Sequence, residues 1–103
     1  MTPSQRQRIL DGIAALGQLP TDDEGALDTT RFSQWETLLA QLSKPVSNDE
    51  ALLLATLFPS DESDAYGLAW TLLHLIETAP GWPIREAITS APPHWRTILD
   101  ARL

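Results

Sequence analysis

Residues 65–76 read AYGLAWTLLHLI, the longest apolar run in the chain. This stretch contains no acidic residue, lysine or arginine, and apolar side chains occupy nearly every position around a helix drawn through it. A helix without a polar face lies in the interior of a bundle. We therefore predict a helix at about 62–79 in the centre of the molecule. The run is interrupted by His74 and is too short to span a bilayer.

Shorter helices are predicted on both sides of this segment, because apolar residues recur at helical spacing between proline-bearing turns. Thr2-Pro3 is a suitable helix start, and Ser47 with Glu50 three residues later forms a capping box. No stretch alternates apolar and polar residues as a half-buried strand would. The predicted helices cover residues 3–18, 29–43, 48–58, 83–90 and 93–102, and an acidic loop is expected at 20–28.

The predicted fold class is all-α, a compact bundle of five or six short helices around the central apolar helix. A chain of 103 residues is served by one hydrophobic core, so residues 1–103 are expected to form a single helical domain. The hydrophobic fraction of 43% is too high for intrinsic disorder. Polar and small residues break the apolar stretch at 9–19, so no secretory signal is expected.

The chain is acidic, and the acid is concentrated in its middle. Fourteen acidic residues stand against seven basic ones, a net charge of −7. Residues 22–64 hold ten of the acids against Arg31 and Lys44, which is −8. This balance argues against binding to nucleic acid or to anionic lipid. Acids are ordinary in turns and in first helical turns, but a focused negative field also attracts a basic protein partner.

The residues give little support for catalysis or for a cofactor. His74 and Glu77 share a helix face and could supply two metal ligands, but a di-iron bundle needs a second such motif, which the sequence lacks. There is no cysteine, no nucleophile elbow and no phosphate-binding glycine loop. We therefore expect neither enzymatic activity nor a metal or other cofactor, and a small enzyme or metal protein remains the third class of function.

A stripe of aromatic and polar side chains runs along one side of the predicted central helix: Tyr66, Trp70, His74 and Glu77. In one interpretation the stripe packs into the core with its polar ends satisfied. In the other, one end is open and contacts a partner. Tryptophan and tyrosine among acids are typical of an interface to a basic protein.

Residues 61–83, DESDAYGLAWTLLHLIETAPGWP, resemble a signature of small helical immunity proteins from contact-dependent growth inhibition and related polymorphic toxin systems. A weaker echo lies in Pro93-His94-Trp95-Arg96. The resemblance implies a cytoplasmic protein that binds the toxic C-terminal domain of a cognate toxin without catalysis. Such toxins are often nucleases, and some helical members resemble partners of ribonuclease A-like toxins. We expect a monomer that forms a 1:1 complex.

Candidate site residues follow from position within these segments, since carboxylates can occupy places that phosphates would take on a basic nuclease. The alternative is a generic helical adaptor or subunit of a bacterial assembly, which an apolar patch outside the acidic region would favour. The candidates for partner binding are Asp22, Asp23, Glu24, Asp61, Glu62, Asp64 and Tyr66, and those for shaping the site are Trp70, His74, Glu77 and Trp82.

Overall fold

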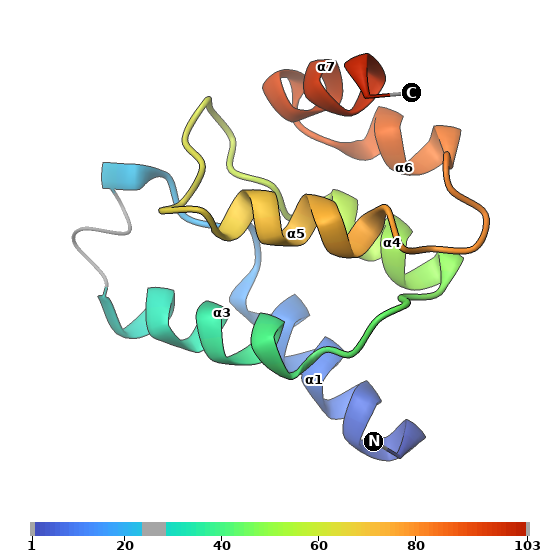
Figure 1. The fold of residues 1–103 in the computed structure, drawn as a ribbon. Helices are drawn as coiled ribbons and strands as arrows, with labels where there is room; N and C mark the ends of the chain where they lie inside the picture. The colour runs from blue at the N-terminus through green and yellow to red at the C-terminus, as the bar shows by residue number, and fades with distance from the viewer. Residues whose placement is uncertain (1, 24–28, 103) are drawn as a thin grey trace.

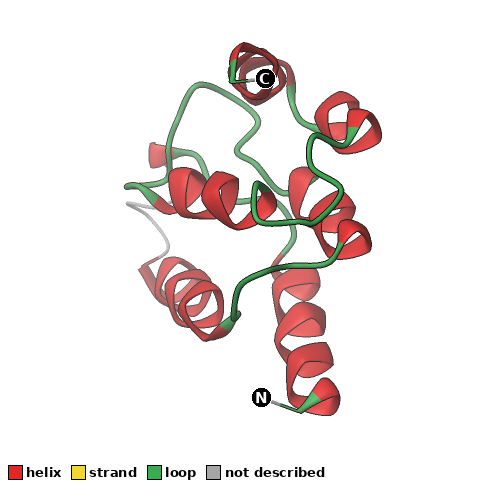
Figure 2. Ribbon diagram, turned by 45° about the vertical axis from the view of Figure 1, so that its right-hand side comes forward, coloured by secondary structure: helices red, strands yellow, loops and turns green. Residues whose placement is uncertain are grey.

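The structure is a computed structural model that describes residues 2–23 and 29–102. Within these two ranges all regular secondary structure is helical, as Figure 2 shows. This confirms the predicted all-α class. The helices are α1 (Pro3–Leu16), α3 (Thr29–Gln41), α4 (Asn48–Ala55), α5 (Leu68–Ile76), α6 (Arg85–Ser90) and α7 (Pro93–Ala101).

Helix α5 lies in the middle of the molecule, with α1 and α3 on one side and α6 and α7 on the other (Figure 1). Contacts join α5 to α3 and α4, and α4 in turn contacts α6. Six of the nine residues of α5 are buried, so the apolar run does supply the centre of the core. They are Leu68, Ala69, Leu72, Leu73, Leu75 and Ile76.

The predicted span 62–79 for this helix is wrong at both ends, most clearly at its start. Ala65, Tyr66 and Gly67 have φ angles of 52°, 53° and 91°, all in the left-handed region. A right-handed helix cannot continue through such residues, so α5 begins at Leu68. Residues 61–67 instead form turns, in which the Asp64 carbonyl accepts hydrogen bonds from the N–H groups of Gly67 and Ala69.

The expectation that this nearly all-apolar helix is enclosed by the bundle also needs correction. The Trp70 residue is 38% exposed, and Thr71 and His74 are exposed as well. These residues form an open strip along α5 that no described helix covers fully. The helix therefore combines a buried face with a half-open edge, and Trp70 stands on that edge.

The other five predicted helices are present, each shorter than predicted. Both predicted helix starts form capping boxes, Thr2 with Gln5 and Ser47 with Glu50. Where a loop was expected at 20–28, Asp22 and Asp23 have helical backbone, and residues 24–28 lie outside the described residues. An ion pair ties α1 to α4, because the Arg6 guanidinium donates to both carboxylate oxygens of Glu50 at 2.7 and 2.8 Å.

Replacing a fully buried side chain of α5 should destabilise the whole domain. We expect Leu72→Ala to lower the free energy of unfolding by about 2–4 kcal/mol, because it leaves a cavity at a position with 0% exposure. The matched control is Thr71→Ala, next to it on the exposed edge, which should change stability by less than about 0.5 kcal/mol. Urea unfolding measures both. Equal effects would contradict the central position of α5.

The Arg6–Glu50 pair should make stability depend on pH. The hydrogen bond from Arg6 lowers the pKa of Glu50, although partial burial opposes it. Because the pKa of Glu50 is lowered in the folded protein, its ion pair contributes fully to the free energy of unfolding above the unfolded-state pKa of about 4.3. This contribution is lost as the pH falls through the folded-state pKa. Glu50→Gln should therefore cost about 1 kcal/mol at neutral pH, a difference that narrows below about pH 4.3. Urea titrations between pH 7 and pH 3 measure the difference in free energy of unfolding between the wild type and Glu50→Gln. A difference that does not change with pH would contradict the role of the ionised Glu50.

Candidate functional site

An open hollow of about 690 Å³ lies where the segment at 22–23 meets the turns at 61–64 and the helices α5 and α7. It gathers residues from four parts of the chain, most of them acidic or aromatic. We call it the acidic hollow, and it is lined by Asp22, Asp23, Asp61, Glu62, Ser63, Asp64, Trp70, His94 and Trp95.

Asp22 joins the two acidic segments through three hydrogen bonds. Its backbone N–H donates to the Ser63 hydroxyl at 3.0 Å, and its carboxylate accepts from the Ala65 N–H at 3.2 Å. Its carbonyl oxygen accepts from the Tyr66 hydroxyl at 3.1 Å. These bonds hold residues 63–66 against a segment more than forty positions earlier in the sequence.

The turn that follows is ordered by Asp61. The Ser63 N–H donates to the Asp61 carboxylate at 2.8 Å. This backbone hydrogen bond is the main cause that lowers the pKa of Asp61, with smaller contributions from the Ser63 hydroxyl and from His94. Asp61 is therefore ionised at neutral pH, and its negative charge is directed into an exposed turn.

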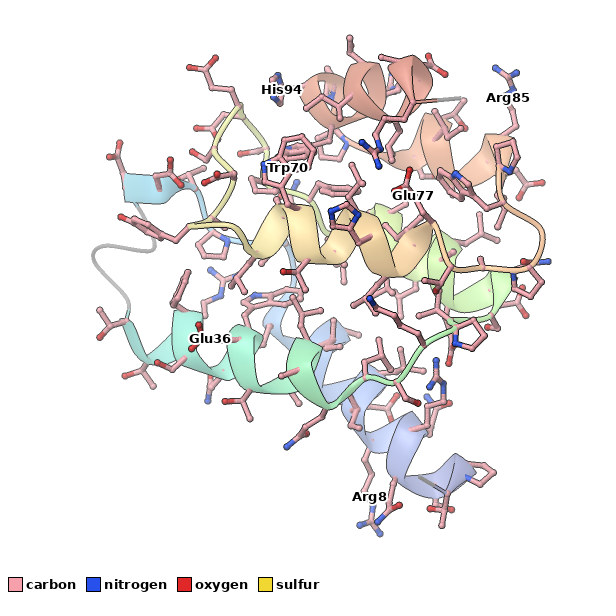
Figure 3. The ribbon with its side chains drawn as sticks, viewed as in Figure 1. Arg8, Glu36, Trp70, Glu77, Arg85 and His94 are labelled. Atoms are coloured by element: carbon pink, nitrogen blue, oxygen red, sulfur yellow. The ribbon has the colours of Figure 1, made fainter. Side chains whose placement is uncertain are left out.

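The other wall of the hollow is aromatic. The Trp95 ring, 1% exposed, stacks on Phe58 with their centroids 5.0 Å apart and their planes at 10°. Trp70 meets Trp95 edge to face, with a centroid distance of 5.2 Å, and His94 meets it in the same manner at 5.5 Å. Figure 3 shows Trp70 between α5 and α7, and His94 beside the start of α7. Packing thus fixes the position of Trp70 while leaving part of its ring open.

Five carboxylates line the hollow, and no arginine or lysine of the described residues forms an ion pair with any of them. The ion pairs that do form lie elsewhere, between Arg6 and Glu50 and between Arg102 and Glu77. Among the described lining residues, only His94 can carry a positive charge. Within the described residues, the hollow therefore concentrates five carboxylates with His94 as its one ionisable base.

Most of the residues predicted to bind a partner come together here. Asp22 and Asp23 meet Asp61, Glu62 and Asp64 at the hollow, although the two groups are far apart in the sequence. Glu24 lies outside the described residues.

Tyr66 stands beside the hollow without lining it. Its side chain is exposed, its ring packs edge-on against Phe32 at 5.5 Å, and its hydroxyl is bonded to Asp22.

Of the four residues predicted to shape the site, only Trp70 lines the hollow. His74 is exposed further along α5, and Glu77 accepts two hydrogen bonds from Arg102 at 2.8 and 2.9 Å, which lower the pKa of Glu77. Figure 3 shows Glu77 at the far end of α5 from Trp70. Trp82 is half-buried in the turn before α6. The stripe predicted along the helix is therefore divided, with one member at the hollow.

Three lining residues were missing from the sequence-based candidates. His94 and Trp95 lie in the segment Pro93–Arg96, and that weaker echo of the 61–83 resemblance was the signal that could have indicated them. Ser63 lies within residues 61–83 itself, but its hydrogen bond from the Asp22 N–H joins segments far apart in the sequence and has no local signal.

Two other observations bear on the class of protein. No helix in the described part of the chain is long and apolar enough to cross a membrane, and no three or more histidine, aspartate or glutamate side chains there are placed so that they could hold one metal ion. No family model, curated protein or solved structure matches this chain. The fold and the site define an all-helical domain with an acidic hollow that has a partly exposed aromatic wall.

Two substitutions at Asp22 should separate its hydrogen bonding from its charge. Asp22→Ala removes the acceptor for the Ala65 N–H, and we expect it to destabilise the domain by about 1–2 kcal/mol. Asp22→Asn keeps an acceptor oxygen and removes one clustered negative charge, so its cost should stay below about 0.5 kcal/mol. Amide hydrogen exchange at Ala65 and urea unfolding measure the difference. Equal exchange in both variants would show that the Asp22 carboxylate does not hold the Ala65 N–H.

Proposed function

We propose that this protein is an immunity protein, which binds the toxic domain of a cognate bacterial toxin through the acidic hollow and neutralises it without catalysis. The observation that carries the proposal is the convergence of five carboxylates, none of them ion-paired with an arginine or lysine that the structure describes, on one hollow beside a partly exposed tryptophan. A focused negative field attracts a basic protein and speeds its association. Buried tryptophan contacts dominate the energy of many interfaces.

A basic nuclease is the kind of toxin that this surface would suit. Nucleases carry positive charge where they hold phosphates, and a row of carboxylates can occupy the same positions. The resemblance to immunity proteins spans residues 61–83, which include Asp61, Glu62 and Asp64 as well as Trp70. The stretch that carries the resemblance therefore supplies much of the hollow.

The hydrogen bonds in the hollow favour binding over catalysis. A serine hydrolase needs a hydroxyl bonded to a base that can take its proton. The Ser63 hydroxyl accepts the Asp22 N–H, and among the described residues no hydrogen bond joins it to His94, the histidine of the hollow. Ser63 serves to hold the two acidic segments together.

A second candidate function, a helical adaptor, is favoured by a different surface. An uncharged groove of about 730 Å³ runs between α1 and α3, outside the acidic hollow. It is lined by Gly12, Ala15, Leu16, Thr29, Thr30, Ser33, Gln34, Thr37 and Leu38. An adaptor that docks a helix in this groove would not need the carboxylates of the hollow.

The experiment mixes the purified protein with the toxin domain encoded in the adjacent reading frame and measures association at increasing salt. We expect a 1:1 complex whose association slows as salt rises, because salt screens charges in solution. The triple variant Asp61→Asn, Glu62→Gln, Asp64→Asn should slow association at low salt about tenfold.

The matched control removes the same charge away from the hollow, with Asp11→Asn, Glu36→Gln and Asp100→Asn, all on exposed side chains. It should slow association by less than about threefold, because none of these carboxylates lines the hollow. No binding at any salt concentration would reject the immunity function. Equal losses for the two triple variants would reject the hollow as its site.

A further inference from the structure

We propose that the acidic hollow receives an arginine side chain of the partner protein, with the guanidinium against the exposed part of the Trp70 ring and its N–H groups directed at carboxylates of both acidic segments. This inference rests on the proposed function and names the group that the site recognises. It is carried by two features of the hollow in addition to its charge: a fixed, open aromatic ring and a buried donor without an acceptor.

The carboxylates alone would attract a cation, and the exposed Trp70 ring adds a surface on which the cation can stack. Trp70 is one of three large hydrophobic residues exposed among those that the structure describes, and it is 38% exposed. Its position is set by contact with Trp95, which stacks in turn on Phe58. An open indole that is already held in place can receive a cation on its ring with little loss of side-chain entropy.

The arrangement of acceptors favours a planar, branched cation. Asp22 and Asp23 lie on one chain segment, and Asp61, Glu62 and Asp64 lie on another, so the acceptors come from two adjoining segments of the hollow's lining. An arginine guanidinium has five N–H groups in a fixed plane, and it can stack on a ring while donating outward. A lysine ammonium is a compact, strongly hydrated charge and gains less from such a ring.

A buried donor on the same wall is also unsatisfied. The Trp95 indole N–H is buried and has no hydrogen-bond partner among the described residues, and Trp95 lines the hollow. Buried polar groups are nearly always hydrogen-bonded. The indole N–H of Trp35 is also buried without a partner among the described residues, but only Trp95 of the two lines the hollow. Arginine within a protein segment brings main-chain carbonyl oxygens with it, whereas a free metal ion or a polyamine brings none.

The test compares two peptides of equal charge, hexa-arginine and hexa-lysine, by titration into the wild-type protein. We expect hexa-arginine to bind about three- to fivefold more tightly, the range of a cation–π contact at an exposed site. Trp70→Leu should abolish this preference. His74→Leu, which removes an exposed ring elsewhere on α5, should preserve it.

A second measurement uses only the wild-type protein, so that it does not depend on how a variant folds. The four tryptophans give separate indole resonances in an NMR spectrum. Hexa-arginine should shift the resonances of Trp70 and Trp95 more than hexa-lysine does, and should leave that of Trp35, which is fully buried, unchanged. Equal affinity for the two peptides, or a preference that survives in Trp70→Leu, would overturn the inference.

The outcomes also separate this inference from the proposed function. Suppose that the two peptides bind equally, while the toxin domain still binds and the triple variant at residues 61, 62 and 64 slows its association. The arginine contact is then wrong and the immunity function stands. If the arginine preference is found but no toxin domain binds, the immunity function is wrong. The hollow then recognises arginine on a different basic protein.

Discussion

The burial of α5 is the constraint on which the rest of the structure depends. Its inner face supplies six buried residues that pack against α3 and α4. The helix can begin only after the left-handed residues 65–67, so the turns at 61–64 are placed at its amino-terminal end. Trp70 then stands on the open edge of the first turn, next to α7. The position of the acidic hollow follows from how this one helix is buried.

The hydrogen bonds of Asp22 hold two acidic segments together at the hollow although their charges repel. Like charges brought together destabilise a folded domain, and each of the two segments that meet here is acidic. Asp22 offsets the repulsion with its three hydrogen bonds to residues 63–66. Left-handed Ala65 and Tyr66 add a local cost of about 1–2 kcal/mol each. A cationic partner would relieve the repulsion, whereas water and salt only screen it.

Sequence reasoning predicted the helices because prolines, capping boxes and apolar spacing are local signals. It failed where the outcome depended on contacts between distant segments. Gly67 is a residue type expected at a positive φ, but Ala65 and Tyr66 carry no such mark, and so the start of α5 was placed too early. The acids were correctly recognised as concentrated, yet their meeting depends on Asp22 and Ser63. The spacing of His74 and Glu77 correctly placed both residues on one face. It could not show that the hollow extends along α5 only as far as Trp70.

The most direct test of the central claim is amide hydrogen exchange of the protein, free and bound to the toxin domain. If the partner binds in the acidic hollow, protection should appear at residues 22–23, 61–66 and 94–96 and along the exposed edge of α5 at Trp70. The groove between α1 and α3 should exchange as it does in the free protein. Protection confined to Gly12–Leu16 and Thr29–Leu38 would contradict the claim, and it would place the partner in that groove.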